Sequence, residues 1–196
     1  MLKSYRGDPP GYGDAYRCMF SQAEVNLINL MRLLWSQHIY WTRMTIISIA
    51  HDLPDLDPTL QRLLRNATDF EMAFSPFYGD CIANQFGMLI KEHLVIAAEL
   101  VKAAKAGDEQ KASDAEKRWY ANADQIVCFL NQINPNWPVE AMRSLWYEHL
   151  ALTKAEAVAR LSKEYAKDIA IFDQIEQEAL MMADSFANGI IRQFCF

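Results

Sequence analysis

Apolar residues recur at steps of three and four along most of this chain, the spacing that places side chains on one face of an α-helix. Comparable series resume after each interruption by Gly or Pro. In the first stretch the series consists of Leu27, Met31, Leu34, His38, Trp41, Thr45 and Ile49. The pattern predicts long helices over residues 21–52, 75–106, 109–133, 138–161 and 162–194, and short helical segments over 57–66 and 68–74.

Residues typical of helix ends flank these stretches. Ser21 precedes Glu24 at the spacing of a capping box, Pro76 stands at the expected start of the second long helix, and Gly107 is followed by Asp108. No segment shows the alternation of a β-strand. Because short connections make neighbouring helices antiparallel, the sequence predicts an all-α, antiparallel up-down bundle of about five long helices with a short helical insert.

The segment over residues 1–20 differs from the rest of the chain. It mixes three glycines and two prolines with tyrosines, a composition that disfavours a long helix. We therefore expect an irregular N-terminal segment over residues 1–20 and one helical-bundle domain over residues 21–196. A total of 196 residues is enough for a single domain with a substantial core.

Three of the four histidines share one local pattern. His38, His93 and His149 each follow apolar residues at the third and fourth preceding positions, a Gln or Glu directly before, and an Ile or Leu directly after. The two intervals between successive histidines differ by a single position. A nearly constant period is typical of a supersecondary unit used more than once, so the sequence predicts internally duplicated hairpins over residues 75–133 and 138–194.

Counting residues from the predicted turns places several ionisable groups at one depth of the bundle. At about 1.5 Å per helical residue, the three histidines fall within roughly a turn of three carboxylates on the predicted partner helices. This candidate polar layer consists of His38, His93, His149, Asp124, Asp173 and Glu176. Burying such groups is costly unless they pair or bind something.

The sequence supports three functions for such a layer. Imidazoles and carboxylates from facing helices build metal sites in bundles, so the first is a metal-binding protein that holds Zn, Fe or Mn, with a metal-dependent enzyme as one form of it. The second is a structural or interaction protein, such as a homodimer, whose histidines are core polar residues. The third is a small-molecule binder that uses Trp35, Trp41 and Trp146.

Charge and composition exclude other classes of function. A net charge of −6 without a basic cluster argues against nucleic-acid binding, and the absence of a Gly-rich phosphate loop argues against a nucleotide cofactor. No run reaches about 18 uncharged apolar residues, so no membrane association is expected. The four isolated cysteines are typical of reduced thiols, and we expect a cytoplasmic protein.

Several short runs carry a resemblance to a known family: Trp35 to Arg43, Trp119 to Asp124, Asn134 to Trp137, Glu148 to Thr153 and Ala179 to Asp184. Over residues 22–194 the chain resembles a little-characterised bacterial family of small all-helical proteins, some of which are called acetylglutamate kinase. That kinase activity requires an α/β fold and glycine-rich phosphate loops, which this sequence lacks. A looser, fold-level analogy exists with the DinB-like helical bundles and their three metal-binding histidines, although the ligand spacing differs.

Overall fold

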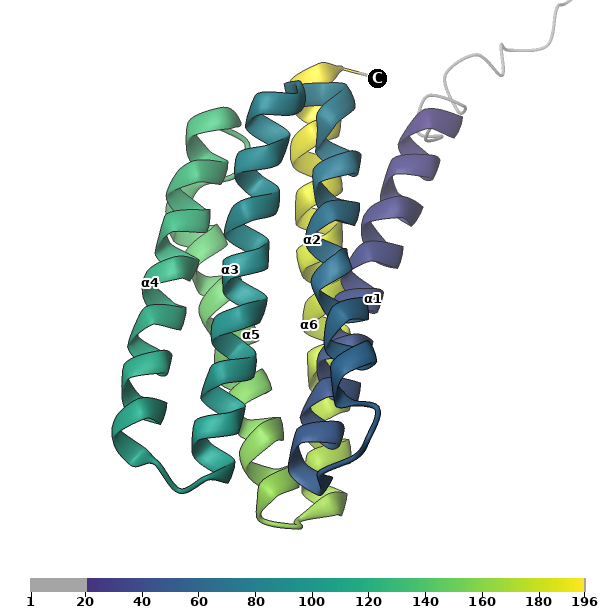
Figure 1. Ribbon diagram of the computed structural model, residues 1–196. Helices are drawn as coiled ribbons and strands as arrows, with labels where there is room; N and C mark the ends of the chain where they lie inside the picture. Colours follow the sequence, from purple (N-terminus) through teal and green to yellow (C-terminus); the bar gives the residue numbers. More distant parts are fainter. Residues whose placement is uncertain (1–20, 196) are drawn as a thin grey trace, which may run out of the picture.

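The computed structural model describes residues 21–195, which form six α-helices joined by short connections (Figure 1). The expected irregular segment 1–20 lies outside the described residues. The helices are α1 (Gln22–His51), α2 (Leu56–Tyr78), α3 (Asp80–Lys105), α4 (Glu109–Ile133), α5 (Val139–Leu161) and α6 (Tyr165–Phe194). The prediction of an all-α antiparallel bundle is confirmed.

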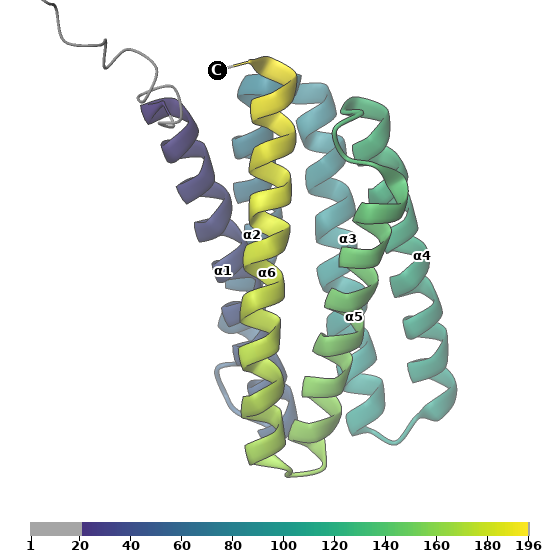
Figure 2. The same ribbon diagram turned by 180° about the vertical axis from the view of Figure 1, so that it is seen from behind.

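Successive helices run up and down, so α1, α3 and α5 share one direction and α2, α4 and α6 share the other (Figure 1). Each helix packs against the next along the chain, and α6 closes the ring by packing against α1 as well as α5 (Figure 2). In addition, α1 contacts both α3 and α5. The three helices of the first direction therefore meet in the interior of the bundle.

Local sequence signals explain where several helices begin and end. Ser21 and Glu24 form the expected capping box, in which the Ser21 side chain accepts a hydrogen bond from the Glu24 amide. The Asp108 carboxylate accepts a hydrogen bond from the Lys111 amide and so caps α4. Gly107 follows the end of α3 with a φ of 69°, a left-handed conformation that glycine adopts without strain.

The predicted short insert is wrong in length, because α2 is a full helix of 23 residues. Pro76 does not open the second long helix as expected; it lies inside the last turn of α2. The break falls instead at Gly79, whose φ of 77° favours glycine, and α3 begins at Asp80. The bundle therefore has six long helices rather than five.

The core consists of large aromatic and aliphatic side chains over most of the bundle length. Trp35, Trp119, Trp137 and Trp146 are among its largest fully buried members. None of the described helices contains an apolar stretch long enough to cross a membrane.

Candidate metal centre

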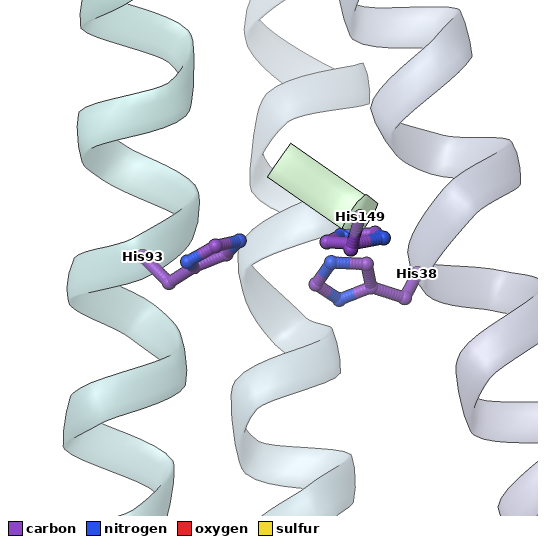
Figure 3. A group of neighbouring side chains, drawn as sticks. All are labelled: His38, His93 and His149. Atoms are coloured by element: carbon purple, nitrogen blue, oxygen red, sulfur yellow. The ribbon is translucent and has the colours of Figure 1, made fainter. Parts of the chain in front are cut away.

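Three histidine side chains from different helices meet inside the bundle (Figure 3). His38 on α1, His93 on α3 and His149 on α5 are exposed by only 1%, 1% and 2%. One nitrogen of each imidazole lies within 4.8 Å of the corresponding nitrogens of the other two. Three ligand nitrogens around a tetrahedral zinc ion lie about 3.3 Å apart. Small movements of the rings would therefore allow all three nitrogens to coordinate one ion.

The helix ends explain why these histidines reach one level. Each of them lies about three and a half turns before the last residue of its helix. The three helices run in the same direction and end at the same end of the bundle (Figure 1). At about 1.5 Å per residue, the imidazoles therefore lie at nearly equal heights. Equal spacing along the chain becomes equal depth in the fold.

The Nδ1 atom of each imidazole faces an oxygen on the antiparallel helix that follows. The distances are 2.9 Å from His38 to Asn66 Oδ1, 3.3 Å from His93 to Asn122 Oδ1 and 3.0 Å from His149 to Glu178 Oε2. These partners lie on α2, α4 and α6, and the separation along the chain is almost the same in each pair. The three hairpins thus repeat one arrangement.

The orientation of the two asparagines determines where the imidazole protons are. Asn66 Nδ2 donates to the carbonyl of Leu34 at 3.0 Å, and Asn122 Nδ2 donates to that of Leu89 at 3.2 Å. Both amide oxygens therefore face a histidine, and an oxygen can only accept. The Nδ1 atoms of His38 and His93 must carry the proton, which leaves Nε2 unprotonated in the neutral ring.

His149 follows the same rule through a carboxylate. Glu178 is buried, and its Oε2 accepts from Nδ1 of His149. His38 and His93 consequently offer Nε2 as the lone-pair atom, and His149 offers the same atom when its ring is neutral. No hydrogen bond within residues 21–195 occupies these three Nε2 atoms.

Burial keeps the imidazoles of His38 and His93 in their neutral form. The pKa of His38 is lowered from 6.5 to about 3, mainly because burial penalises the charged ring and also because His149 is close, although the Asn66 hydrogen bond acts in the opposite direction. The pKa of His93 is lowered for the same main reason, with His38 and His149 contributing. Neutral imidazole is the form that binds metal ions.

The structure does not bring the three predicted carboxylates to the histidines. Asp124 accepts hydrogen bonds from Arg143 Nε at 3.0 Å and from the Tyr147 hydroxyl at 3.1 Å. Glu176 accepts from the Tyr40 hydroxyl, and Asp173 is exposed. The cluster that could hold an ion among the described residues consists of the three histidines alone.

The prediction for these carboxylates failed because of their rotation about the helix axis and not because of their height in the bundle. The inward face of α6 includes Ile175 and Glu178, which differ by about 60° around the axis, whereas Asp173 is turned by about 160° from Ile175. Sequence reasoning missed Asn66 and Glu178. Both could have been found by extending the histidine period, because Asn66, Asn122 and Glu178 follow one another at equal intervals along the chain.

Indole rings surround the histidines. The Trp35 ring centroid is 5.2 Å from His38 and 5.8 Å from His149, and Trp119 and Trp146 each lie 5.2 Å from His93. The ring of Trp41, by contrast, stacks under the Arg62 guanidinium, 5.1 Å from its centroid. The aromatic wall excludes water and lowers the local dielectric, which strengthens any charge interaction inside it.

A scan against protein-family models found no match, and neither a search of curated proteins nor a search of solved structures found a significant one. The chemistry of the site must therefore be argued from its own geometry.

Proposed function

We propose that the protein binds one divalent transition-metal ion through the Nε2 atoms of His38, His93 and His149. The observation that carries this proposal is the meeting of three buried imidazoles from different helices, each of which brings one nitrogen to within 4.8 Å of those of the other two. Burying three acceptors side by side without a donor is unfavourable. A cation at their centre would offset this cost by forming a coordinate bond with each of the three nitrogens.

The outer partners support the same proposal. Metal-binding histidines commonly donate their second ring N–H to a carboxylate or carbonyl oxygen, which fixes the tautomer and makes the ligand nitrogen more basic. Asn66, Asn122 and Glu178 stand in that relation to the three rings. A purely structural core histidine would pair its second nitrogen with a donor instead of placing it beside two other imidazoles.

The ligand set favours Zn²⁺ or Fe²⁺ over Mn²⁺. Imidazole nitrogens suit zinc, iron, nickel and copper, whereas manganese prefers sites richer in oxygen ligands. Three protein ligands leave a coordination position free for water or a substrate, as in catalytic zinc sites. A metal ion bound there would supply Lewis acidity or an activated water, so the proposed function extends to a metal-dependent enzyme.

Metal content and thermal stability together test the proposal. Protein purified without chelator should contain about one metal ion per chain, and chelation should lower its melting temperature, because an ion bound only by the folded state stabilises that state. Replacing His38, His93 or His149 by Ala should each remove most of the bound metal and abolish the response to chelator.

His51→Ala is the matched control, because the fourth histidine lies at the end of α1, where its ring faces Tyr165. It should keep both the metal and the chelator response. Identical melting curves for the parent protein with added Zn²⁺ or Fe²⁺ and with chelator, together with no metal in the purified protein, would leave the histidines as core polar residues only.

A further inference from the structure

A cavity of about 280 Å³ lies between α1, α3, α4 and α5, on the side of the histidines toward the α3–α4 and α5–α6 connections. Its walls are almost wholly apolar and include Ile46, Leu94, Val101 and Ala157. At its outer end the rim contains Val158 and Glu109, which are exposed. The cavity is therefore accessible from the surface and leads inward between the helices.

The inner end of the cavity approaches the proposed metal centre. Thr42, Ala97 and Thr153 line it, and each lies four positions after one of the three histidines. Residues at this separation on a helix are stacked about one turn, or about 5.4 Å, from each other. Trp119, whose ring centroid lies 5.2 Å from that of His93, lines the same end.

Two of the residues that line this inner end each have a buried polar atom without a partner. The Trp119 Nε1 and Thr42 Oγ1 atoms are buried and make no hydrogen bond with any described residue. Trp119 is only 2% exposed, and its indole N–H can only donate. An unpaired buried donor is costly, so these atoms indicate an acceptor that a ligand would supply.

We propose that this cavity binds a monocarboxylate with an unbranched aliphatic chain of about eight carbons. The inference rests on the proposed metal site: the carboxylate would lie between the metal and the Trp119 N–H, and the chain would extend along the apolar wall. A cation and an N–H donor at the inner end both require an acceptor. The aliphatic wall requires that the rest of the ligand be apolar.

Size and charge agree with this ligand. A cavity of about 150 Å³ holds one benzene molecule, so a cavity of about 280 Å³ accommodates roughly ten to twelve non-hydrogen atoms, and octanoate has ten. At the centre, a divalent ion would face three imidazoles and the single carboxylate of Glu178. One bound carboxylate would balance the remaining positive charge, which a buried site requires.

Binding of octanoate, measured calorimetrically on protein whose metal content is known, tests the inference. The Zn²⁺-loaded protein should bind octanoate at least tenfold more tightly than the metal-free protein. It should also bind octanoate at least a hundredfold more tightly than acetate, since each buried methylene contributes about fourfold. In Co²⁺-loaded protein, octanoate should change the visible absorption of the metal.

Ala97→Leu fills the inner end of the cavity and should weaken octanoate binding at least tenfold while leaving the metal content unchanged. Ala155→Leu is the matched control on α5, because Ala155 is also half-buried but does not line the cavity. The Co²⁺ spectrum of the parent protein decides the question even where Ala97→Leu prevents folding.

The possible failures can be told apart. A protein that holds one metal per chain but shows neither octanoate binding nor a spectral change overturns the ligand and leaves the metal site standing. A protein that takes up no metal overturns both. Binding of 1-octanol as tight as that of octanoate, or unaltered binding in Ala97→Leu, also overturns the carboxylate at this position.

Discussion

The Nδ1 atom of His149 lies 3.0 Å from Oε2 of Glu178, whereas the matching atoms of the other two histidines face amide oxygens. Three hairpins thus repeat one His–acceptor pair, and only the last pair contains a carboxylate. That carboxylate places a single negative charge beside the centre of three imidazoles. A divalent cation bound there would be attracted by it, and His149 would become the most basic ligand.

Replacing Glu178 should therefore weaken metal binding by an amount that depends on the substitute. Glu178→Ala removes both the charge and the acceptor, and we expect a loss of about 10- to 100-fold in metal affinity. Glu178→Gln keeps an acceptor for His149 and should lose less. Competition with a chromophoric chelator measures both affinities.

Glu176→Gln is the control for this series. Glu176 lies two positions away on the same helix but bonds to the Tyr40 hydroxyl outside the cluster. Its replacement should leave metal affinity unchanged. Equal losses in the variants at 176 and 178 would mean that the effect arises from the total charge of α6 and not from the contact with His149.

The buried imidazoles should make the metal-free protein sensitive to acid. Because the pKa of His38 falls to about 3 in the folded state, from 6.5, the unfolded chain takes up a proton between these values that the folded chain does not. The stabilising contribution is full above pH 6.5 and declines as the pH falls toward 3. For each such histidine, the free energy of unfolding should fall by about 1.4 kcal/mol for every unit by which the pH is lowered within this window.

Urea denaturation of protein freed of metal with a chelator, at pH values between 7.5 and 4.5, measures how the free energy of unfolding changes with pH. His38→Gln should make this dependence shallower, because one group no longer titrates in the unfolded chain, and His51→Ala should leave it unchanged. A parent protein whose stability is flat across this range would show that the imidazoles become charged within the fold.

The sequence allowed the histidines to be located but not their partners. The position of a residue along a helix can be counted from the helix ends. The same local pattern surrounds His38, His93 and His149, and this counting places all three at the same depth in the bundle. Rotation about the axis depends on which face packs inward. Ile175 and Glu178 face inward on α6, whereas the predicted Asp173 and Glu176 do not.

The length of α2 was missed for a different reason. Pro76 is a strong signal for a helix start, but it lies inside the last turn of α2, and Gly79 provides the actual break. Without a full-length α2, Asn66 has no place beside His38. The His–acceptor pair between α1 and α2 was therefore not recognised, although its spacing is present in the chain.

A second buried polar group, near the α5–α6 connection, combines two arginines and two carboxylates. Arg43 donates to Asp168 at 2.9 Å and also to Glu156, and Arg160 pairs with Asp168. Both carboxylates are buried. Burial raises the pKa of Glu156 from 4.5 to about 7, and Arg43 only partly offsets it. Asp168 is the carboxylate that both arginines share.

Glu156→Gln and Asp168→Asn should consequently have opposite effects. Since the folded-state pKa of Glu156 lies above 4.5, its contribution to stability is full below that pH and declines as the pH rises through 7. Relative to the parent, Glu156→Gln should therefore gain stability between pH 5.5 and pH 8. Asp168→Asn leaves buried arginine charge uncompensated and should cost about 3 kcal/mol or more.

Urea denaturation at the two pH values measures these differences. Val158→Thr, on the exposed side of α5, is the control for the general effect of a substitution in this helix. Its stability relative to the parent should not depend on pH. A Glu156→Gln protein that loses stability at pH 8 but not at pH 5.5 would show that the ionised carboxylate contributes more through Arg43 than burial takes away.

Gly189 on α6 faces the buried indole of Trp137. The Trp137 Nε1 atom donates to the Ser185 carbonyl at 3.0 Å, so the ring lies across the α6 backbone. A Cβ at position 189 would meet Nε1 at 2.0 Å, which is far inside contact distance. Gly189→Ala should therefore displace the ring, break its hydrogen bond and cost about 2 kcal/mol or more of stability.

Gly87→Ala on α3 separates this clash from the general effect of replacing a helical glycine. A new Cβ there would meet Glu71 Oε2 at 2.9 Å, the end of a flexible side chain that can move, and Glu71 Cβ and the Ala67 carbonyl oxygen at 3.1 and 3.3 Å, which need to shift by only a few tenths of an ångström. Alanine favours the helix by up to about 1 kcal/mol, so this variant should stay within about 1 kcal/mol of the parent. Thermal denaturation compares the two variants, and tryptophan fluorescence reports whether Trp137 has moved. Equal stabilities would mean that the indole can leave the α6 backbone without cost, and that its position does not depend on the absence of a side chain at 189.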